Sequence, residues 1–317
     1  MVIVVGNTQS ITVQSGHMKH LFLVMIVGVL MGCGKKKAPE NKADPSVIRD
    51  TLREMSYAEF VIRAELNKPQ GELTKSDYDK VTKLTIMNPA MTEMSGLEKL
   101  SQLKALDLTG NHLTSVSGID KLTNLEILDL EVNKLSILPD LKNLVKLKRL
   151  DLGQNQLTSI SGIENLTNLE KLTLYDNQLT SIKGLGKLTQ LTSLNLENNQ
   201  LTNLGDIVSE IADLKQLQML KISENLISDL KDIEDLAHLE ILFLSGNQIT
   251  SIKGLDKLTK LTALHLNDNQ LASIEGLEKL NKLKILNLTG NPDLTPFQIA
   301  KLKKSLPNCL ITSPTAK

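Results

Sequence analysis

The chain has 317 residues, with 36 Lys and Arg balanced by 36 Asp and Glu, so its formal net charge is zero. This balance gives no basic surface of the kind that nucleic-acid binding requires, and we expect no nucleic-acid partner. Aromatic residues make up only 2% of the chain, so aliphatic residues must fill any core that it forms.

A sorting signature begins at Met18. Met18-Lys19-His20 is basic, an apolar run follows from Leu21 to Leu30, and small residues precede Cys33. This order is typical of a secretory signal peptide, and the apolar run is too short to span a bilayer. Residues 1–17 contain no Lys or Arg, so we expect Met18 to be the true start and residues 1–33 to be the removed segment.

The end of this segment, Leu30-Met31-Gly32-Cys33, resembles a bacterial lipobox. The resemblance implies that Cys33 becomes the lipidated first residue of the mature protein and anchors it to a membrane of the cell envelope. Ordinary cleavage and an uncleaved anchor are the alternatives. Gly34 rather than Asp follows the cysteine, which in a Gram-negative host favours the outer membrane. Residues 34–45 are polar and lack an apolar period, so they are expected to form a disordered tether.

Residues 46–80 are predicted to form a helical N-terminal cap. Ser56 with Glu59, and Thr74 with Asp77, have the spacing of capping boxes, in which the first side chain and the fourth satisfy each other's backbone N–H groups. A stack of apolar coils needs such a cap because its core is otherwise open at the end.

Residues 81–291 repeat the pattern Leu-x-x-Leu-x-Leu-x-x-Asn in steps of 22, with a single step of 26. A fixed period of this length indicates a solenoid, and this pattern is that of leucine-rich repeats. We therefore predict an α/β solenoid of about ten repeats, shaped as a horseshoe or arc. Short parallel strands should line its concave face, with 3₁₀ and short helical pieces on the convex face and helical caps at both ends.

The asparagine that closes each repeat is predicted to point inward. Its side chain carries two donors and an acceptor, so it can bond backbone groups left unpaired where the chain turns, within its own coil and the next. In the step of 26, residues 205–214 carry apolar residues at helical spacing and predict a longer convex helix. The asparagine ladder comprises Asn111, Asn133, Asn155, Asn177, Asn199, Asn225, Asn247, Asn269 and Asn291.

Residues 292–317 are predicted to be a C-terminal cap and tail. Thr295 is a suitable N-cap with Pro296 at the first helical position, and Leu310-Ile311 could form a last strand.

The stretch from Ala58 to Ile86 resembles the N-terminal cap of internalin-like bacterial leucine-rich-repeat proteins, through Glu-Leu-Asn-Lys-Pro, Gly-Glu-Leu-Thr and Asp-Tyr-Asp. The Leu-Pro-Asn-Cys sequence ending at Cys309 is similar to endings in the same family. The resemblance covers about residues 58–311. It implies the fold and a protein-binding role, but it does not name the partner.

On the outward face of the predicted strands, Asp107, Asp129 and Asp151 align with Glu131 in an acidic strip. Like charges in register cost stability, so a basic partner or a cation such as calcium would relieve them. Ordinary solvated aspartates are the alternative, and we assign no metal site from the sequence.

Two aromatic residues, Tyr175 and Phe243, also fall at outward positions, with Ile241 and His265 beside Phe243. Exposed aromatic side chains near apolar neighbours are typical anchors of protein interfaces. We therefore hypothesise that these four residues lie in a protein-binding site, although scattered surface apolarity would look the same.

We expect no enzyme and no cofactor, because the sequence has no nucleophile–base pair, zinc-spaced Cys/His set or phosphate loop. The first functional interpretation is a monomeric protein-binding module, anchored by lipid to the bacterial envelope. The second is an internalin-like surface adhesin. The third is a cytosolic regulator, because the 22-residue repeat also resembles phosphatase-regulatory leucine-rich-repeat proteins; it requires that residues 18–33 are not a signal.

Overall fold

The computed structural model describes residues 2–5, 9–12, 57–87 and 96–314. Cys33, the lipobox and the predicted tether lie outside these residues. Near the start of the chain, β1 (Val2–Val5) pairs with β2 (Gln9–Thr12) in antiparallel register. None of the helices in the described ranges has the length and apolarity needed to cross a membrane.

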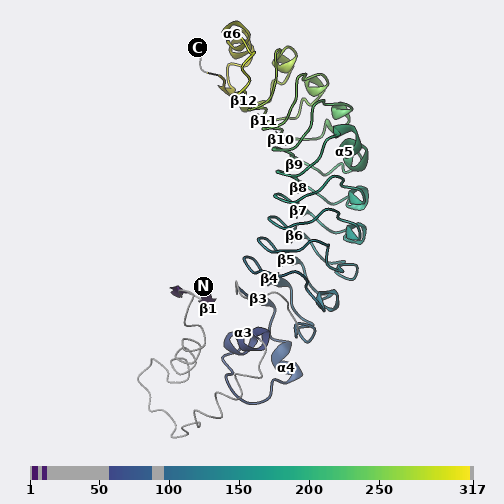
Figure 1. Ribbon diagram of the computed structural model, residues 1–317, viewed down its shortest axis with the longest axis vertical. Coiled ribbons are helices and arrows are strands. Elements are labelled where there is room, and N and C mark those ends of the chain that lie inside the picture. The colour runs from purple at the N-terminus through teal and green to yellow at the C-terminus, as the bar shows by residue number, and fades with distance from the viewer. Residues whose placement is uncertain (1, 6–8, 13–56, 88–95, 315–317) are drawn as a thin grey trace.

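The body of the molecule is an arc built on one parallel sheet of eleven strands, whose spatial order follows the chain from β3 to β13. Figure 1 shows the strands along the inner side of the arc and the helical segments along the outer side. The predicted fold class is therefore confirmed. The strands are β3 (Lys83–Thr85), β4 (Ala105–Asp107), β5 (Ile127–Asp129), β6 (Arg149–Asp151), β7 (Lys171–Thr173), β8 (Ser193–Asn195), β9 (Met219–Lys221), β10 (Ile241–Phe243), β11 (Ala263–His265), β12 (Ile285–Asn287) and β13 (Leu310–Thr312).

The core is a stack of leucine layers. In each strand the central residue points inward and its two neighbours point outward, as the alternation of a strand requires; Leu128 and Leu172, for example, are essentially fully buried. Burying one such side chain contributes about 1.5–3 kcal/mol, but a single coil has nothing to bury it against. The neighbouring coils supply that surface, which fixes the register of every strand and the direction of every outward side chain.

The convex side consists mainly of 3₁₀ helices, each entered through a left-handed residue. That residue is usually glycine, such as Gly162 with φ 100°, and Asp232 takes the same role with φ 62°. Asp140 does not adopt a positive φ, and no helix forms over its repeat. The 3₁₀ helices are η1 (Ile119–Lys121), η2 (Ile163–Asn165), η3 (Leu185–Lys187), η4 (Ile233–Leu236), η5 (Leu255–Lys257) and η6 (Leu277–Lys279).

Full α-helices occur where the regular repeat is interrupted. In the 26-residue repeat, α5 (Leu204–Ile211) begins at the N-cap Asn203, as the helical spacing predicts. The N-terminal cap contains α3 (Tyr57–Glu65) and α4 (Lys75–Tyr78).

A capping box starts one helix at each end of the arc. Thr74 and Asp77 form the capping box of α4. Hydrogen bonds from Lys68 and Thr74 hold the pKa of the Asp77 carboxyl far below its ordinary value. The C-terminal cap is α6 (Pro296–Ser305), where Thr295 and Gln298 form the second box. β13 follows α6 and forms the open end of the sheet.

Candidate functional site: the concave strand face

The asparagine ladder fixes the turn that follows each strand. Asn177 Nδ2 donates to the carbonyls of Leu152 at 2.9 Å and Leu174 at 3.1 Å, and its Oδ1 accepts from the backbone N–H of Leu157 at 2.9 Å. Asn177 therefore bonds the preceding coil as well as its own. The sequence analysis predicted bonds to its own coil and the next, so the direction was wrong. The same three-way pattern holds for Asn133, Asn155, Asn177, Asn199, Asn225, Asn247, Asn269 and Asn291, while Asn111 donates in the same way to Ile86 and Leu108.

Three carboxylates of the predicted acidic strip come together, and we call Asp129, Glu131 and Asp151 the acidic cluster. One carboxylate oxygen from each lies within 4.8 Å of the others. Asp107 pairs in register with Asp129 but is outside this group. Thr109 links the two, because its hydroxyl donates to Asp129 at 2.8 Å and its N–H to Asp107 at 3.0 Å. Carboxylate oxygens are the ligands that calcium prefers, so these three residues are the group that could hold a cation.

Asp151 is buried, with 6% of its surface exposed. Burial is the main cause that raises the pKa of its carboxyl to about 6, and the charges of Asp129 and Glu131 add to the effect. The Gly153 N–H donates to it at 3.1 Å and Arg149 lies 3.8 Å away, and both act in the opposite direction. The sequence interpretation considered solvated aspartates here, so the burial of Asp151 is a structural finding.

Tyr175 contacts the acidic cluster, whereas the sequence analysis grouped it with Phe243. Its ring lies so close to Gly153 that an added Cβ there would clash with ring carbons Cε1 and Cδ1. Its hydroxyl donates to the Glu131 carboxylate. Burial is the first cause that raises the pKa of Tyr175, and the hydrogen bond to Glu131 is the second. The half-buried Tyr175 ring therefore packs on Gly153 and is bonded to one carboxylate of the cluster.

The second group, on β9 to β11, is built around Phe243. The Phe243 and His265 rings stack with centroids 4.3 Å apart and planes 5° apart. Lys221 Nζ lies 4.9 Å from the Phe243 centroid and 3.5 Å from a Glu197 carboxylate oxygen. Burial lowers the pKa of His265, and the charge of Lys221 acts in the same direction while Glu197 opposes it.

Ile241 is part of a longer row of aliphatic side chains, which we call the apolar strip. Its members occupy the same position in five consecutive strands and pair in register across the sheet. The first three are half-buried, whereas Ile285 is 44% exposed and Leu310 is 66% exposed. The last strand extends the row to the open end of the sheet. The members of the apolar strip are Met219, Ile241, Ala263, Ile285 and Leu310.

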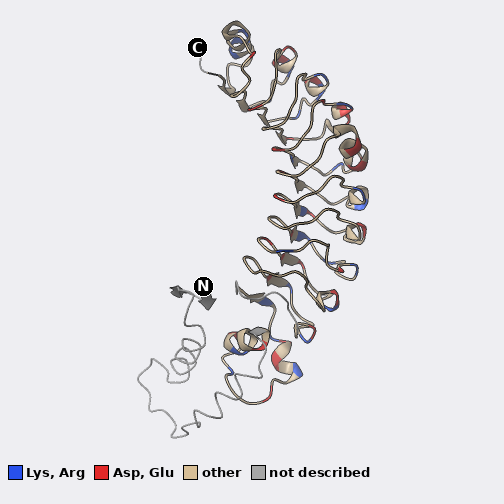
Figure 2. Ribbon diagram, viewed as in Figure 1, with Lys and Arg blue, Asp and Glu red and all other residues tan. Residues whose placement is uncertain are grey.

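The four residues of the hypothesised aromatic site therefore fall into two groups. Tyr175 follows β7, and Phe243 ends β10, three strands further along. At a spacing of ~4.8 Å per strand, this separates them by roughly 14 Å along the sheet. Figure 2 shows acidic and basic residues interspersed along the whole arc, so no single sign of charge covers it.

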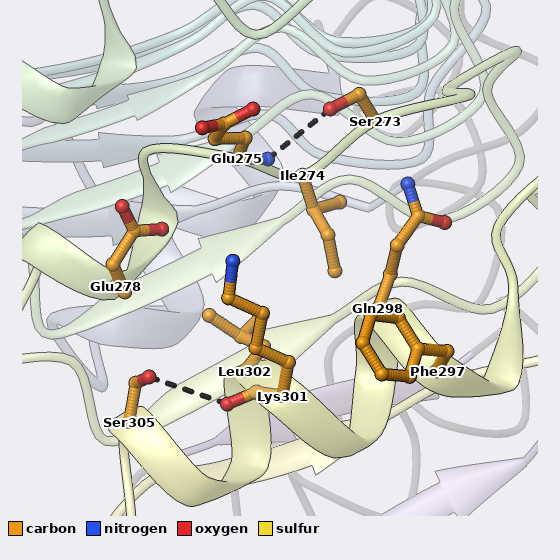
Figure 3. A pocket seen from close by; sticks show the side chains of 9 residues that line it. All are labelled: Ser273, Ile274, Glu275, Glu278, Phe297, Gln298, Lys301, Leu302 and Ser305. Atoms are coloured by element: carbon orange, nitrogen blue, oxygen red, sulfur yellow. Dashed lines mark hydrogen bonds between the residues drawn. The ribbon is translucent and has the colours of Figure 1, made fainter.

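A hollow of about 140 Å³ lies at the C-terminal cap, between the turn before η6 and α6. Figure 3 shows Ile274 and Leu302 within it, Glu275 and Glu278 to one side, and the ring of Phe297 at another edge. Its lining mixes apolar floor with charged rim and presents no grouping of catalytic side chains.

The family comparison agrees with the repeat pattern. The family model described as "Leucine Rich repeats (2 copies)" matches residues 101–143, 123–166, 145–177, 167–209 and 259–304. A second model, "Leucine rich repeat", matches residues 189–249. No curated protein is similar enough to count as a match.

Solved structures resemble the chain over most of its length. An internalin C2 from Listeria monocytogenes is 31% identical, with a TM-score of 0.58, and the match covers 73% of this chain and 91% of that one. An internalin (InlF) from the same species is 27% identical, with a TM-score of 0.51, and the match covers 81% and 94%. The functional domain of Listeria InlJ, at 21% identity and a TM-score of 0.54, shares the fold over 76% of this chain and 64% of that one. The chain belongs to the leucine-rich-repeat family, and it is similar to the Listeria internalins.

Proposed function

We propose that this protein is a monomeric protein-binding module that holds a partner on its concave strand face and is tethered to a bacterial cell envelope by a lipid on Cys33. It acts by binding and not by catalysis. The observation that carries the binding role is the row of outward aromatic and aliphatic side chains centred on Phe243, on a sheet face formed entirely by repeated strands.

Two properties of this face support a binding role. The strands are held from behind by buried leucines and by the asparagine ladder, so the outward side chains are positioned before a partner arrives. A rigid surface loses less conformational entropy on binding than a flexible one. Aromatic side chains at such positions are also typical of the residues that dominate interface energetics.

The binding role is tested by affinity capture from envelope extracts with the full-length protein, and with a variant that carries both Phe243→Ala and Tyr175→Ala. We expect the double variant to lose the partners that the parent retains. A variant with Phe297→Ala, on α6, removes an exposed aromatic ring away from the strand face and should retain them. Equal capture by the parent and the double variant would refute the proposal.

The lipid anchor is supported by the sequence from Met18 to Cys33, with its basic start, short apolar run and Leu-Met-Gly-Cys ending. Mass spectrometry of the membrane fraction should find a mature chain that begins at a lipid-modified Cys33. Cys33→Ser should move the protein out of the membrane fraction. A mature protein with a free Cys33 thiol would rule out the anchor.

A second candidate is a surface adhesin, favoured by the 31% identity with an internalin over most of the chain. The two candidates differ in which side of the envelope the arc faces. Protease added to intact cells should digest an adhesin, whereas it should leave a module that faces inward intact until the cells are opened.

A further inference from the structure

We propose that a segment of a partner protein rich in Lys and Arg docks along the edge of the concave face where the strands end. This inference rests on the proposed function, because it names the kind of partner that the concave face receives. Two independent observations carry it: a row of carboxylates along that edge, and a buried hydroxyl within the row that lacks a hydrogen-bond partner.

The carboxylates lie at three positions of the repeat: the last residue of the strand, and the second and third residues after it. Backbone bonds between coils continue past the strands and hold these positions side by side. The Asp176 N–H donates to the Glu197 carbonyl at 3.0 Å, and the Glu224 N–H donates to the Ser245 carbonyl at 2.8 Å. We call the resulting row the acidic rim. Its members, from β4 to β11, are Asp107, the acidic cluster, Asp176, Glu197, Glu224 and Asp268.

The acidic rim is short of cations. Among the described residues, only two of its carboxylates form ion pairs, Asp151 with Arg149 at 3.8 Å and Glu197 with Lys221 at 3.5 Å. From β4 to β11, Lys221 is the one Lys or Arg at the three positions of the rim.

The cations that border the acidic rim do not remove this excess. Lys83, Arg149 and Lys171 open their strands on one side of the rim, and Lys134 lies on the other side. Together with Lys221 they are still fewer than the carboxylates of the rim. A partner with basic side chains therefore complements the charge of this edge, whereas an acidic partner would be repelled.

An unsatisfied hydroxyl lies within the acidic rim. Ser223 is the second residue after β9. Glu197 occupies the same position one coil earlier, and Glu224 is the next residue. Ser223 is 6% exposed, and its hydroxyl oxygen is buried without a hydrogen bond. A buried polar group without a partner costs free energy. The ammonium and guanidinium groups of Lys and Arg are donors that a hydroxyl oxygen can accept from, so a cation drawn to the two glutamates would satisfy Ser223.

The length of the acidic rim sets the length of the segment. From β4 to β11 the rim spans roughly 34 Å at ~4.8 Å per strand. An extended chain of about ten residues covers this distance. One exposed ion pair contributes little, so we expect binding only from a segment that carries several cations.

The test measures binding of a fluorescein-labelled synthetic peptide of about twelve alternating Lys and Ser residues to the full-length protein. The anisotropy of the label is followed in a buffer with EDTA, which removes divalent cations. The Lys peptide should bind, more weakly as salt is added, and a peptide of alternating Glu and Ser should not. A variant that combines Asp176→Asn, Glu197→Gln and Glu224→Gln should bind the Lys peptide about tenfold more weakly. Ser223→Ala should weaken binding about threefold without lowering the unfolding midpoint, because it removes an unsatisfied group.

A matched variant separates the acidic rim from net charge alone. It combines Asp206→Asn, Asp213→Asn and Asp235→Asn, which removes the same charge from exposed residues on and near α5 and η4. This variant should bind the Lys peptide as the parent does. Equal weakening in the two triple variants would overturn the inference, and so would a Ser223→Ala variant that binds as tightly as the parent.

Affinity capture from envelope extracts separates this inference from the proposed function. Partners that are lost by the Phe243→Ala and Tyr175→Ala double variant but kept by the variant of Asp176, Glu197 and Glu224 would overturn the inference and leave the proposed function standing. Partners that both variants keep would refute both proposals.

Discussion

The two halves of the concave face share one scaffold and carry opposite kinds of surface. On β4 to β7 the outward positions are dominated by charged side chains, and the acidic cluster lies there, bonded to the Tyr175 hydroxyl. Among the outward residues of strands β9 to β13, Lys221 is the one Lys, Arg, Asp or Glu, and it pairs with Glu197, which follows β8. The apolar strip takes the place of charge there. The same leucines and asparagines lie behind both halves, so the repeat determines the backbone and leaves the outward columns free to differ.

This difference has a physical consequence. Charged groups respond to salt and pH, because their interactions are screened and their protonation changes. Contacts between apolar side chains depend much less on salt and pH. The halves should therefore be separable by experiment, although both are built on the same coils.

The largest expected effect concerns what the halves have in common. Asn155→Ala in the charged half and Asn247→Ala in the apolar half should each reduce the free energy of unfolding by about 1–3 kcal/mol, because each leaves backbone groups of two coils without partners. Asn177→Ala, between the halves, should behave in the same way. Chemical denaturation with circular dichroism measures all three.

Exposed asparagines provide the control for these variants. Asn281→Ala changes an exposed residue outside the ladder whose φ is not positive, and it should shift the unfolding midpoint far less. If Asn155→Ala and Asn247→Ala reduced the free energy of unfolding by very different amounts, the scaffold would not be uniform. The comparison of the two halves would then be weaker.

The fold could be predicted from the sequence because the repeat encodes local geometry many times over. The inward leucines, the asparagine positions and the helix at α5 all follow from spacing within one repeat. The site could be predicted only in part, since it depends on contacts between repeats. Gly153 leaves room for the Tyr175 ring, whose hydroxyl then reaches the Glu131 carboxylate. No pattern within a single repeat reveals such a pair.

Two further features depended on longer-range geometry. Leu310 falls in register with Ile285 only because α6 returns the chain to the end of the sheet, and the cap does not follow the 22-residue period. Val132 adopts φ 57°, a left-handed conformation that is strained for a β-branched residue. It occupies the column that precedes each asparagine, where Gln154 and Asp176 also have positive φ, so the turn imposes its geometry on whichever residue is present.

The second prediction isolates the charged half. Asp151 stays protonated in the folded protein up to a pH of about 6, against 3.8 for the ordinary carboxyl. The folded chain therefore binds more protons between these pH values, and its free energy of unfolding should fall as the pH rises through this window. Asp151→Asn removes the ionisation and should raise the free energy of unfolding at pH 7 by about 1–2 kcal/mol. This is less than the roughly 3 kcal/mol to which the raised pKa corresponds, because an amide fits the site less well.

The measurement is chemical denaturation of parent and variant at several pH values between 4 and 7. Asp213→Asn, on an exposed carboxylate, should leave the pH profile of the parent unchanged. If Asp151→Asn proves neutral and the profile keeps its slope, the burial of this carboxyl is not what distinguishes the charged half.

The smallest effect is expected in the apolar half, where Phe243→Ala removes the ring between Lys221 and His265. The loss of the stack should reduce the free energy of unfolding by about 0.5–1.5 kcal/mol. Because burial is the main cause that lowers the pKa of His265, the uncovered imidazole should titrate at higher pH, closer to its ordinary value. NMR titration of the His265 ring protons follows this shift, and Phe297→Ala on α6 should not produce it. A His265 pKa that stayed the same in Phe243→Ala would mean that the ring stack does not shield the imidazole, and the two halves would then differ in charge alone.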